Sequence, residues 1–216
     1  MIVQFKKNPF LKPSRFFREN SKVFYPLLIV CIVASYFFID KPFALFFSSF
    51  KSDWLDILFL INNLLNPFFT LILFPFLFFF IRFIQRKERK SRKLWYLSFA
   101  TALPIFLTSF LAVIVGRASP EWLFIHKEMI IRFFEWNPSF HSFPSTTSCN
   151  VGAISAALCY LYPKQSYKFF PLGIFVGMVP ALLTLCFISD ALAGICIGML
   201  SARAVFKLMR KEISFS

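Results

Sequence analysis

Six long apolar stretches, separated by short polar or basic segments, constrain the fold of this chain more than any other feature of its sequence. A transmembrane helix needs about 20 apolar residues, with about 17 as the lower limit, and the first and fourth stretches lie near that limit. The chain is 58% hydrophobic and contains 34 Phe, which is more apolar surface than a soluble domain of this size can bury. We therefore predict an all-α fold, a six-transmembrane-helix bundle within residues 23–211. The stretches are residues 23–39, 57–84, 94–115, 145–161, 169–188 and 189–208.

The basic residues are distributed unevenly along this pattern. All but five of the 24 Lys and Arg residues lie in segments that the six spans would place on one side of the membrane, at 1–22, 82–93, 163–168 and 203–211. The positive-inside rule then places both termini in the cytoplasm. A net charge of +14 is also typical of nucleic-acid binding, but these charges lie where topology requires them. We predict a multi-pass protein of the inner (plasma) membrane with no nucleic-acid partner.

The segments outside the spans carry further expectations. Residues 1–22 form a basic amphipathic arm, which either lies on the inner leaflet or is a basic tail. No Ala-x-Ala-like site follows the first apolar stretch, so we expect an uncleaved span rather than a signal peptide. Residues 40–56 are expected to form an outer loop, and 116–143 a longer one. Within that longer loop, residues 128–136 could form a short surface helix.

Polar and small residues inside the spans indicate how the helices pack. Asn62 and Asn66 are four apart, so they would share a helix face that points into the bundle rather than into lipid. Small residues four apart let helix backbones approach closely. We therefore expect a tightly packed core of the last three spans. The small residues are Gly152 with its alanine neighbours, the pair Gly173 and Gly177, and the pair Gly194 and Gly198.

The five cysteines lie in apolar segments and lack the spacing of metal ligands. Their positions are Cys31, Cys149, Cys159, Cys186 and Cys196. Buried free thiols are the default interpretation. We predict neither a metal nor a cofactor.

Three short stretches resemble the motifs of the type 2 phosphatidic acid phosphatase (PAP2) family, which also includes haloperoxidases. That family carries Lys-x6-Arg-Pro, Pro-Ser-Gly-His and Ser-Arg-x5-His-x3-Asp. Residues 116–120, Gly-Arg-Ala-Ser-Pro, are similar to the end of the first motif, with Ser119 at the Arg position and Arg117 as the nearby cation. Residues 144–147, Pro-Ser-Thr-Thr, are similar to the second. In the third, Cys186 stands at the His position and Asp190 matches the Asp.

The resemblance implies a six-span fold with its site at the outer, periplasmic face. It also implies a mechanism in which the third-motif His attacks phosphorus, the Asp orients that His and the second-motif His protonates the leaving oxygen. Of the motif side chains that would do this chemistry or bind phosphate, only Ser145 and Asp190 remain here. A single proton-transfer group contributes about 10²–10⁴-fold to rate. The resemblance therefore predicts a PAP2-like fold that lacks the usual catalysis.

Other residues could still supply chemistry. Cys186 would act as a thiolate nucleophile only if a cation or a helix N-terminus lowered its pKa, and His141 lies just before the second motif. Asp190 is either a site group or a first-turn carboxylate of the last span. A phosphate could bind at the N-terminus of the fourth span, although ordinary capping explains the same residues. The phosphate-binding candidates are Arg117, Ser119, Ser145, Thr146 and Thr147.

These observations leave three hypotheses for function. The first is a non-catalytic membrane protein that binds a phospholipid or isoprenoid-phosphate headgroup, with membrane lipids as partners. The second is an active but atypical membrane lipid phosphatase, acting on phosphatidic acid, lipid A or undecaprenyl pyrophosphate. The third is a lipid-phosphate transporter, which only the polar residues of the second span support. The first is the prediction that the motif residues favour.

Overall fold

The computed structural model describes residues 21–49, 54–86 and 88–214, and within these ranges the chain is helical and contains no β-strand. The predicted arm, 1–22, lies almost wholly outside the described residues. The helices are α2 (Ser21–Ala34), η2 (Ser35–Ile39), α3 (Asp40–Ser48), α4 (Trp54–Leu64), α5 (Pro67–Phe79), η3 (Phe80–Ile84), α6 (Glu88–Val115), α7 (Pro120–His126), η4 (Pro138–Phe140), α8 (Thr146–Leu161), η5 (Pro163–Gln165), α9 (Ser166–Gly177), α10 (Val179–Leu182) and α11 (Ile188–Ser214).

Among the residues that the structure describes, four helical segments are long and apolar enough to cross a membrane. They are Tyr25–Ser48, Pro67–Ile84, Lys90–Val115 and Ile188–Met209. The helices α8 and α9 have 16 and 12 residues, which is below the usual length of a span. Large apolar side chains such as Phe37, Phe68 and Phe106 are exposed on the outside, as expected where lipid covers the surface. The all-α fold is confirmed, with helices long and apolar enough to cross a membrane, while the count of six spans and the cytoplasmic position of the termini stay predictions.

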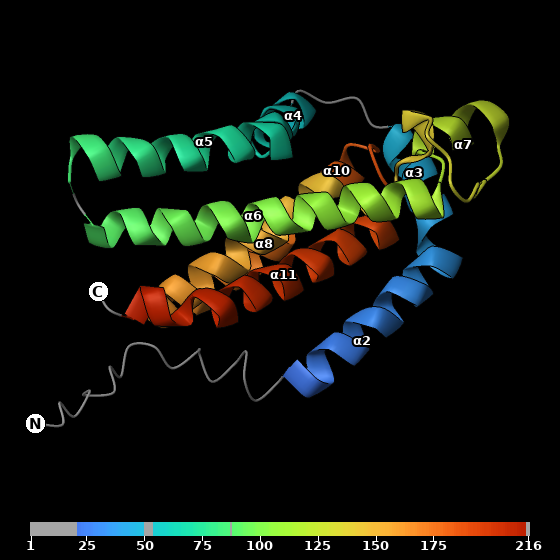
Figure 1. The fold of residues 1–216 in the computed structure, drawn as a ribbon. Helices are drawn as coiled ribbons and strands as arrows, with labels where there is room; N and C mark the ends of the chain where they lie inside the picture. Colours follow the sequence, from blue (N-terminus) through green and yellow to red (C-terminus); the bar gives the residue numbers. More distant parts are fainter. Residues whose placement is uncertain (1–20, 50–53, 87, 215–216) are drawn as a thin grey trace, which may run out of the picture.

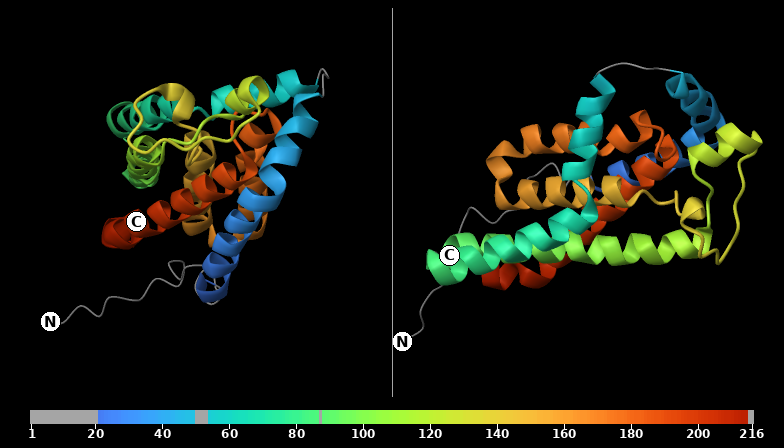
Figure 2. Two further views of the ribbon diagram at one scale, coloured as in Figure 1. Left: turned by 90° about the vertical axis from the view of Figure 1, so that its right-hand side faces the viewer. Right: turned by 90° about the horizontal axis from the view of Figure 1, so that it is seen from above.

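The core lies where α6, α8 and α11 meet. Figure 1 shows α5 and α6 side by side, with α8 and α11 side by side beneath α6. Small residues dominate this contact, among them Ala153, Ala157 and Ala202. Tyr96 of α6 is fully buried against them, and its hydroxyl donates a hydrogen bond to the Ala202 carbonyl at 3.2 Å. The segment from α2 to α3 lies along the outside of this bundle and meets α11 (Figure 2).

Glycines set the short distance between the last helices. A Cβ at Gly194 or Gly198 of α11 would overlap with the backbone of α8, and a Cβ at Gly152 of α8 would lie 2.6 Å from the Ile195 carbonyl oxygen. At Gly173 of α9 a Cβ would overlap with the Ser155 side chain of α8. The expected close packing through small residues is therefore confirmed for α8 on α11 and for α9 on α8, whereas the core itself also includes α6.

The expectation of an outer loop at 40–56 was wrong for its first half. The helical segment that begins at Ser21 continues through η2 and α3 to Ser48, so Asp40 lies within a helix. The apolar residues Phe43, Ala44 and Phe47 follow Asp40, and they extend the helical pattern past the single acidic residue. A charge that is paired inside the fold does not end a helix.

The predicted surface helix at 128–136 was also wrong. The helix of this loop is α7, which has Pro120 in its first turn, where proline is favoured because its missing N–H has no helical partner to lose. Residues 128–136 contain no helix, and Ile131 forms an isolated antiparallel bridge with Arg117.

The second predicted span is broken between α4 and α5. Asn66 accepts a hydrogen bond from the Phe68 N–H at 3.0 Å and thereby caps α5, and Pro67 is the first residue of that helix. Asn62 is buried near the end of α4. The two asparagines therefore do not share one helix face, as the continuous pattern predicted.

Candidate functional site

The three motif stretches come together at one end of the bundle. The N-termini of α8 and α11 lie there, next to the C-terminal end of α6 and the short helices α3, α7 and α10 (Figure 1). Ser145 before α8 and Asp190 in α11 are joined through the backbone, because the Ser145 N–H donates to the Asp190 carbonyl at 3.2 Å. The close glycine-mediated packing of α8 on α11 holds these two starts together.

Asp190 is completely buried, and its carboxylate accepts from three donors. Its Oδ1 accepts from Nη1 of Arg117. Its Oδ2 accepts from the Ser142 hydroxyl at 2.6 Å and from the Phe187 N–H at 3.1 Å. Buried charges persist in proteins where they are paired and hydrogen-bonded, and this carboxylate meets both conditions. Asp190 therefore lies in the first turn of α11 and also belongs to the cluster of polar side chains at this end of the bundle, so the two interpretations are compatible.

A second carboxylate, Asp40, lies in the same cluster. It is 1% exposed, and its Oδ2 accepts from Nη2 of Arg117 at 2.7 Å and from the Ser189 hydroxyl at 2.5 Å. Its Oδ1 accepts from the Ser189 N–H at 3.0 Å. Asp40 thus also has three donors, two of them from the residue that precedes Asp190.

Arg117 lies between the two carboxylates and is 2% exposed. Its Nη1 also donates to the Ser189 hydroxyl at 2.7 Å. The guanidinium carbon lies 4.8 Å from the ring centroid of Tyr36 and 4.2 Å from that of Phe187, distances at which a cation is attracted to a ring face. Arg117 balances only one of two negative charges, so the second depends on hydroxyl and amide donors.

The backbone around Arg117 is fixed by its neighbours. Gly116 has a φ of +55°, and a Cβ there would overlap with the Arg132 carbonyl oxygen. The Arg132 N–H donates to the Gly116 carbonyl at 2.7 Å, and the Ser142 N–H donates to the Arg117 carbonyl at 3.1 Å. Glycine adopts this positive φ without strain, so the Gly-Arg pair can turn the guanidinium inward from the end of α6.

The other phosphate-binding candidates lie at helix starts. Ser145 is the N-cap of α8, and its hydroxyl oxygen accepts from the Ser148 N–H at 3.3 Å and from the Ser148 hydroxyl at 2.8 Å. Thr146 and Thr147 follow it and are partly exposed. Ser119 is the N-cap residue of α7, but its side chain makes no capping hydrogen bond. Capping accounts for Ser145, whereas Thr146 and Thr147 remain open to a ligand.

Cys186 lies in the loop between α10 and α11, next to this cluster, and is 5% exposed. Burial raises the pKa of its thiol well above the ordinary value, and the negative charge of Asp190 acts in the same direction. A hydrogen bond with Ser145 and the charge of Arg117 lower the pKa by less. Thiolate, not thiol, is the nucleophile, so this environment disfavours nucleophilic attack by Cys186.

Neither histidine has its ring engaged with the carboxylates. Nε2 of His141 lies 3.0 Å from the Glu135 carbonyl oxygen. The exposed ring of His126 stacks on Trp122 at 4.0 Å between centroids. Among the described residues, Arg117 is the cation whose side chain hydrogen-bonds to Asp190. Also within the described residues, no group of three or more His, Cys, Asp or Glu side chains is arranged to hold a metal ion.

Three residues of this cluster were missed in the sequence, namely Asp40, Ser142 and Ser189. Asp40 carried a signal, because an acidic residue at the edge of an apolar stretch needs a partner. The sequence did not show which cation that partner is, because Asp40 and Arg117 are 77 positions apart. In the sequence, Ser142 lies in a predicted loop and Ser189 is the first residue of the sixth predicted span, and neither position indicates a partner.

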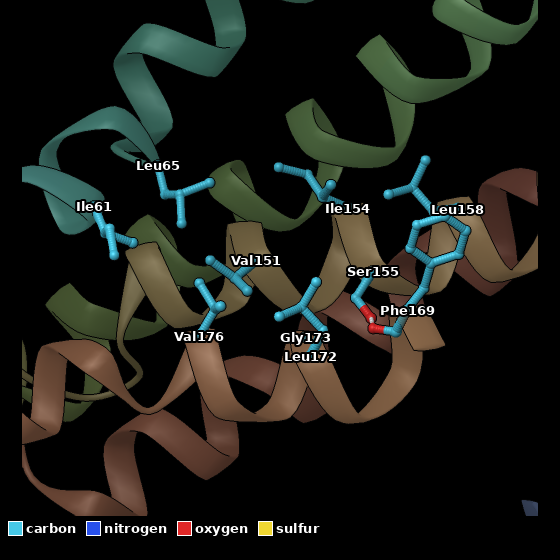
Figure 3. A pocket seen from close by; sticks show the side chains of 10 residues that line it. All are labelled: Ile61, Leu65, Val151, Ile154, Ser155, Leu158, Phe169, Leu172, Gly173 and Val176. Carbon is cyan, nitrogen blue, oxygen red and sulfur yellow. Dashed lines mark hydrogen bonds between the residues drawn. The ribbon is translucent and has the colours of Figure 1, made fainter. Parts of the chain in front are cut away.

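An apolar pocket opens on another face of α8, between α4 and α9. It has a volume of about 260 Å³, and Figure 3 shows its lining side chains, with Ser155 turned to the Phe169 carbonyl at 2.7 Å. Its α8 residues run from Val151 to Leu158, which covers about 10 Å of helix at 1.5 Å per residue. The pocket is long enough for part of a hydrocarbon chain, and none of its lining residues belongs to α11.

Comparison with known proteins agrees with this arrangement. Residues 93–214 match the family model of the PAP2 superfamily. The chain is 31% identical over 103 residues to a lipid A 1-phosphatase of Rhizobium johnstonii, and 32% identical over 92 residues to a lipid A 1-phosphatase of Rhizobium etli. These matches cover 48% and 43% of this chain, but only 42% and 40% of the relatives. No solved structure matches. The family match covers more than half of the chain and includes most of α6 and all of α8 and α11, and the chain belongs to the PAP2 superfamily.

Proposed function

We propose that this protein is a non-catalytic member of the superfamily that binds the phosphorylated headgroup of a membrane lipid at the start of α8 and α11. The observation that carries the proposal is the buried Arg117–Asp190 pair. In the pattern that the chain resembles, the Asp orients a nucleophilic His. Here the Asp190 carboxylate pairs with a guanidinium, and that contact fixes it as part of the fold.

The surroundings of the pair support the loss of catalysis. Phosphoryl transfer depends on positioned groups that stabilise charge on the phosphoryl oxygens. The guanidinium of Arg117 already contacts two carboxylates. The thiol of Cys186 is buried, with its pKa raised by that burial. A nucleophile and an uncompensated cation are the two features that a phosphatase needs first, and neither side chain supplies them.

Other features of this end of the bundle support binding. The first N–H groups of a helix have no helical acceptor and attract anions. Thr146 and Thr147 are partly exposed in the first turn of α8. The relatives named lipid A 1-phosphatase act on a phosphorylated lipid by name, so a lipid phosphate is the headgroup class that we propose. The pocket between α4, α8 and α9 could take one of its hydrocarbon chains.

Binding and turnover by purified protein in lipid nanodiscs test the proposal. We expect no phosphate release from phosphatidic acid, lipid A or undecaprenyl pyrophosphate. We expect phosphatidic acid to bind at least about tenfold more tightly than diacylglycerol, because helix N-termini favour an anion. Thr147→Val should weaken that preference, whereas Thr101→Val, the same change in the interior of α6, should leave it intact.

An active lipid phosphatase is the second candidate, and the names of the relatives favour it. Phosphate release that is abolished by Cys186→Ala or His141→Ala would establish this activity and overturn the first proposal. The transporter hypothesis remains a prediction that a liposome flip assay tests.

A further inference from the structure

The carboxylate of Asp40 occupies a cradle of anion donors that the rest of the chain supplies. Three donor atoms converge on it: Nη2 of Arg117, the backbone N–H of Ser189 and the hydroxyl of Ser189. We propose that this cradle is the binding site for the phosphate group, and that Asp40 is a built-in anion that closes it until a phosphorylated headgroup replaces the carboxylate. The inference rests on the proposed function and names how that site is regulated.

The chemistry of the cradle is that of a phosphate site. A guanidinium matches the spacing of paired oxygen atoms on a carboxylate or a phosphate. A backbone N–H in the first turn of α11 adds a donor at the positive end of the helix dipole. The Ser189 hydroxyl both accepts from Arg117 and donates to Asp40, at 2.7 and 2.5 Å. Each of these donors would serve a phosphoryl oxygen as well as it serves Asp40.

The charge of the cluster also permits the exchange. Arg117 carries one positive charge, and Asp40 and Asp190 bring two carboxylates to it. A phosphate monoanion in place of the Asp40 carboxylate leaves that balance unchanged. Asp190 stays bound to Ser142, Arg117 and the Phe187 N–H, so the exchange does not leave it without donors.

Asp40 is the member of the cluster best placed to leave. Arg117 is held by the loop contacts of Gly116, and Ser189 belongs to α11, the central helix of the bundle. Asp40 instead begins α3, directly after the π-helical turn η2, and π-helical turns are frequent at functional sites. The segment Tyr25–Ser48 is largely exposed along the outside of the bundle (Figure 2).

A small apolar contact holds the closed state. Ala44 of α3 packs with Leu123 of α7 and with Phe187, which also covers the guanidinium of Arg117. Movement of α3 would therefore break this contact and separate Asp40 from the cradle, while Phe187, directly before α11, stays on the guanidinium. The apparent affinity for an anion equals the intrinsic affinity of the open cradle multiplied by the fraction of molecules in which Asp40 has left.

Anion binding by Asp40 variants tests the inference. We would titrate inorganic phosphate and, separately, phosphatidic acid in nanodiscs, into wild type, Asp40→Ala, Asp40→Asn and the control Asp56→Asn. Asp56 is an exposed carboxylate in the first turn of α4, so its variant changes net charge equally. We expect Asp40→Ala to bind phosphate at least about tenfold more tightly than wild type, because no internal anion competes. Asp56→Asn should match wild type.

Asp40→Asn keeps the shape of the side chain and guards against a variant that fails to fold. Its neutral oxygen competes less well for the guanidinium, so its phosphate affinity should lie between those of wild type and Asp40→Ala. Equal phosphate affinity in wild type and in both Asp40 variants overturns the inference, even if wild type binds phosphatidic acid and the proposed function stands. Tighter phosphate binding by the Asp40 variants without any binding of phosphatidic acid supports the cradle and refutes the proposed function.

Discussion

Replacing Arg117 with Met removes the one positive charge that contacts the two buried carboxylates within the described part of the chain. Methionine resembles the arginine stem in length and flexibility, so the change removes mainly the guanidinium. It deletes hydrogen bonds to Asp40, Asp190 and Ser189, together with the contacts to the rings of Tyr36 and Phe187. Two buried carboxylates then remain with no cation beside them from residues 21–49, 54–86 or 88–214.

The expected loss in the free energy of unfolding follows from the carboxylates that stay buried. Removing one partner of a buried ion pair typically costs about 3–5 kcal/mol, because an uncompensated charge stays buried. We expect Arg117→Met to lower the free energy of unfolding by this amount. Asp190→Asn should cost less, about 1–3 kcal/mol, because Arg117 then keeps Asp40 as its partner and the amide oxygen still accepts hydrogen bonds.

Equilibrium unfolding of purified protein in mixed micelles, with increasing mole fraction of SDS, would measure both changes. Arg132→Met is the matched control, since Arg132 lies in the same loop, is exposed, and contacts a single ring, that of Phe140, at 4.9 Å. That variant should lose about 1 kcal/mol or less. Equal stability of the Arg117 and Arg132 variants would refute the reasoning, and so would a larger loss for Asp190→Asn than for Arg117→Met.

Two further changes probe the packing and the chemistry of the same end. Gly198→Ala should lower the free energy of unfolding by about 1–3 kcal/mol, because its Cβ overlaps with the Cys149 carbonyl. Gly177→Ala should cost less, because its Cβ meets side-chain atoms rather than backbone, the nearest being Cδ1 of Ile195 at 2.7 Å. The same SDS titration measures both, and the reverse order would contradict the packing argument. Burial raises the pKa of the Cys186 thiol, so maleimide should label it at least about tenfold more slowly in folded protein than in SDS-unfolded protein. Equally fast labelling, read by peptide mass spectrometry, would restore Cys186 as a possible nucleophile.

Hydropathy and small-residue spacing were enough to predict the helical membrane fold and its most compact part. Gly152, Gly194 and Gly198 lie where a side chain would collide with a neighbouring helix, which is the physical reason for their spacing. The break at Asn66–Pro67 could not be predicted from hydropathy, since the apolar pattern continues on both sides of it. The cap made by Asn66 is a local hydrogen bond, and hydropathy averaged over about 20 residues does not detect it.

The motif resemblance brought Asp190, Ser145 and Arg117 into one hypothesis, and the structure places all three at one end of the bundle. The resemblance could not assign their partners. Arg117 was expected to be the counter-charge for a bound anion, yet its guanidinium contacts Asp40 and Asp190. Those pairs join α3, the loop after α6 and α11, and such long-range contacts depend on the packing of helices rather than on any local pattern.

The charges at this site differ from those of the pattern that the chain resembles. In the pattern that the chain resembles, several cations surround one carboxylate, and a phosphate supplies the missing negative charge. Here one cation, Arg117, meets two carboxylates, and Ser142 and Ser189 supply the remaining donors. The chain itself therefore supplies donors to both carboxylates, although one negative charge has no cation to balance it. This composition is the reason that we propose exchange of one anion for another rather than bond cleavage, because cleavage requires positive charge that stabilises the phosphoryl group in its transition state.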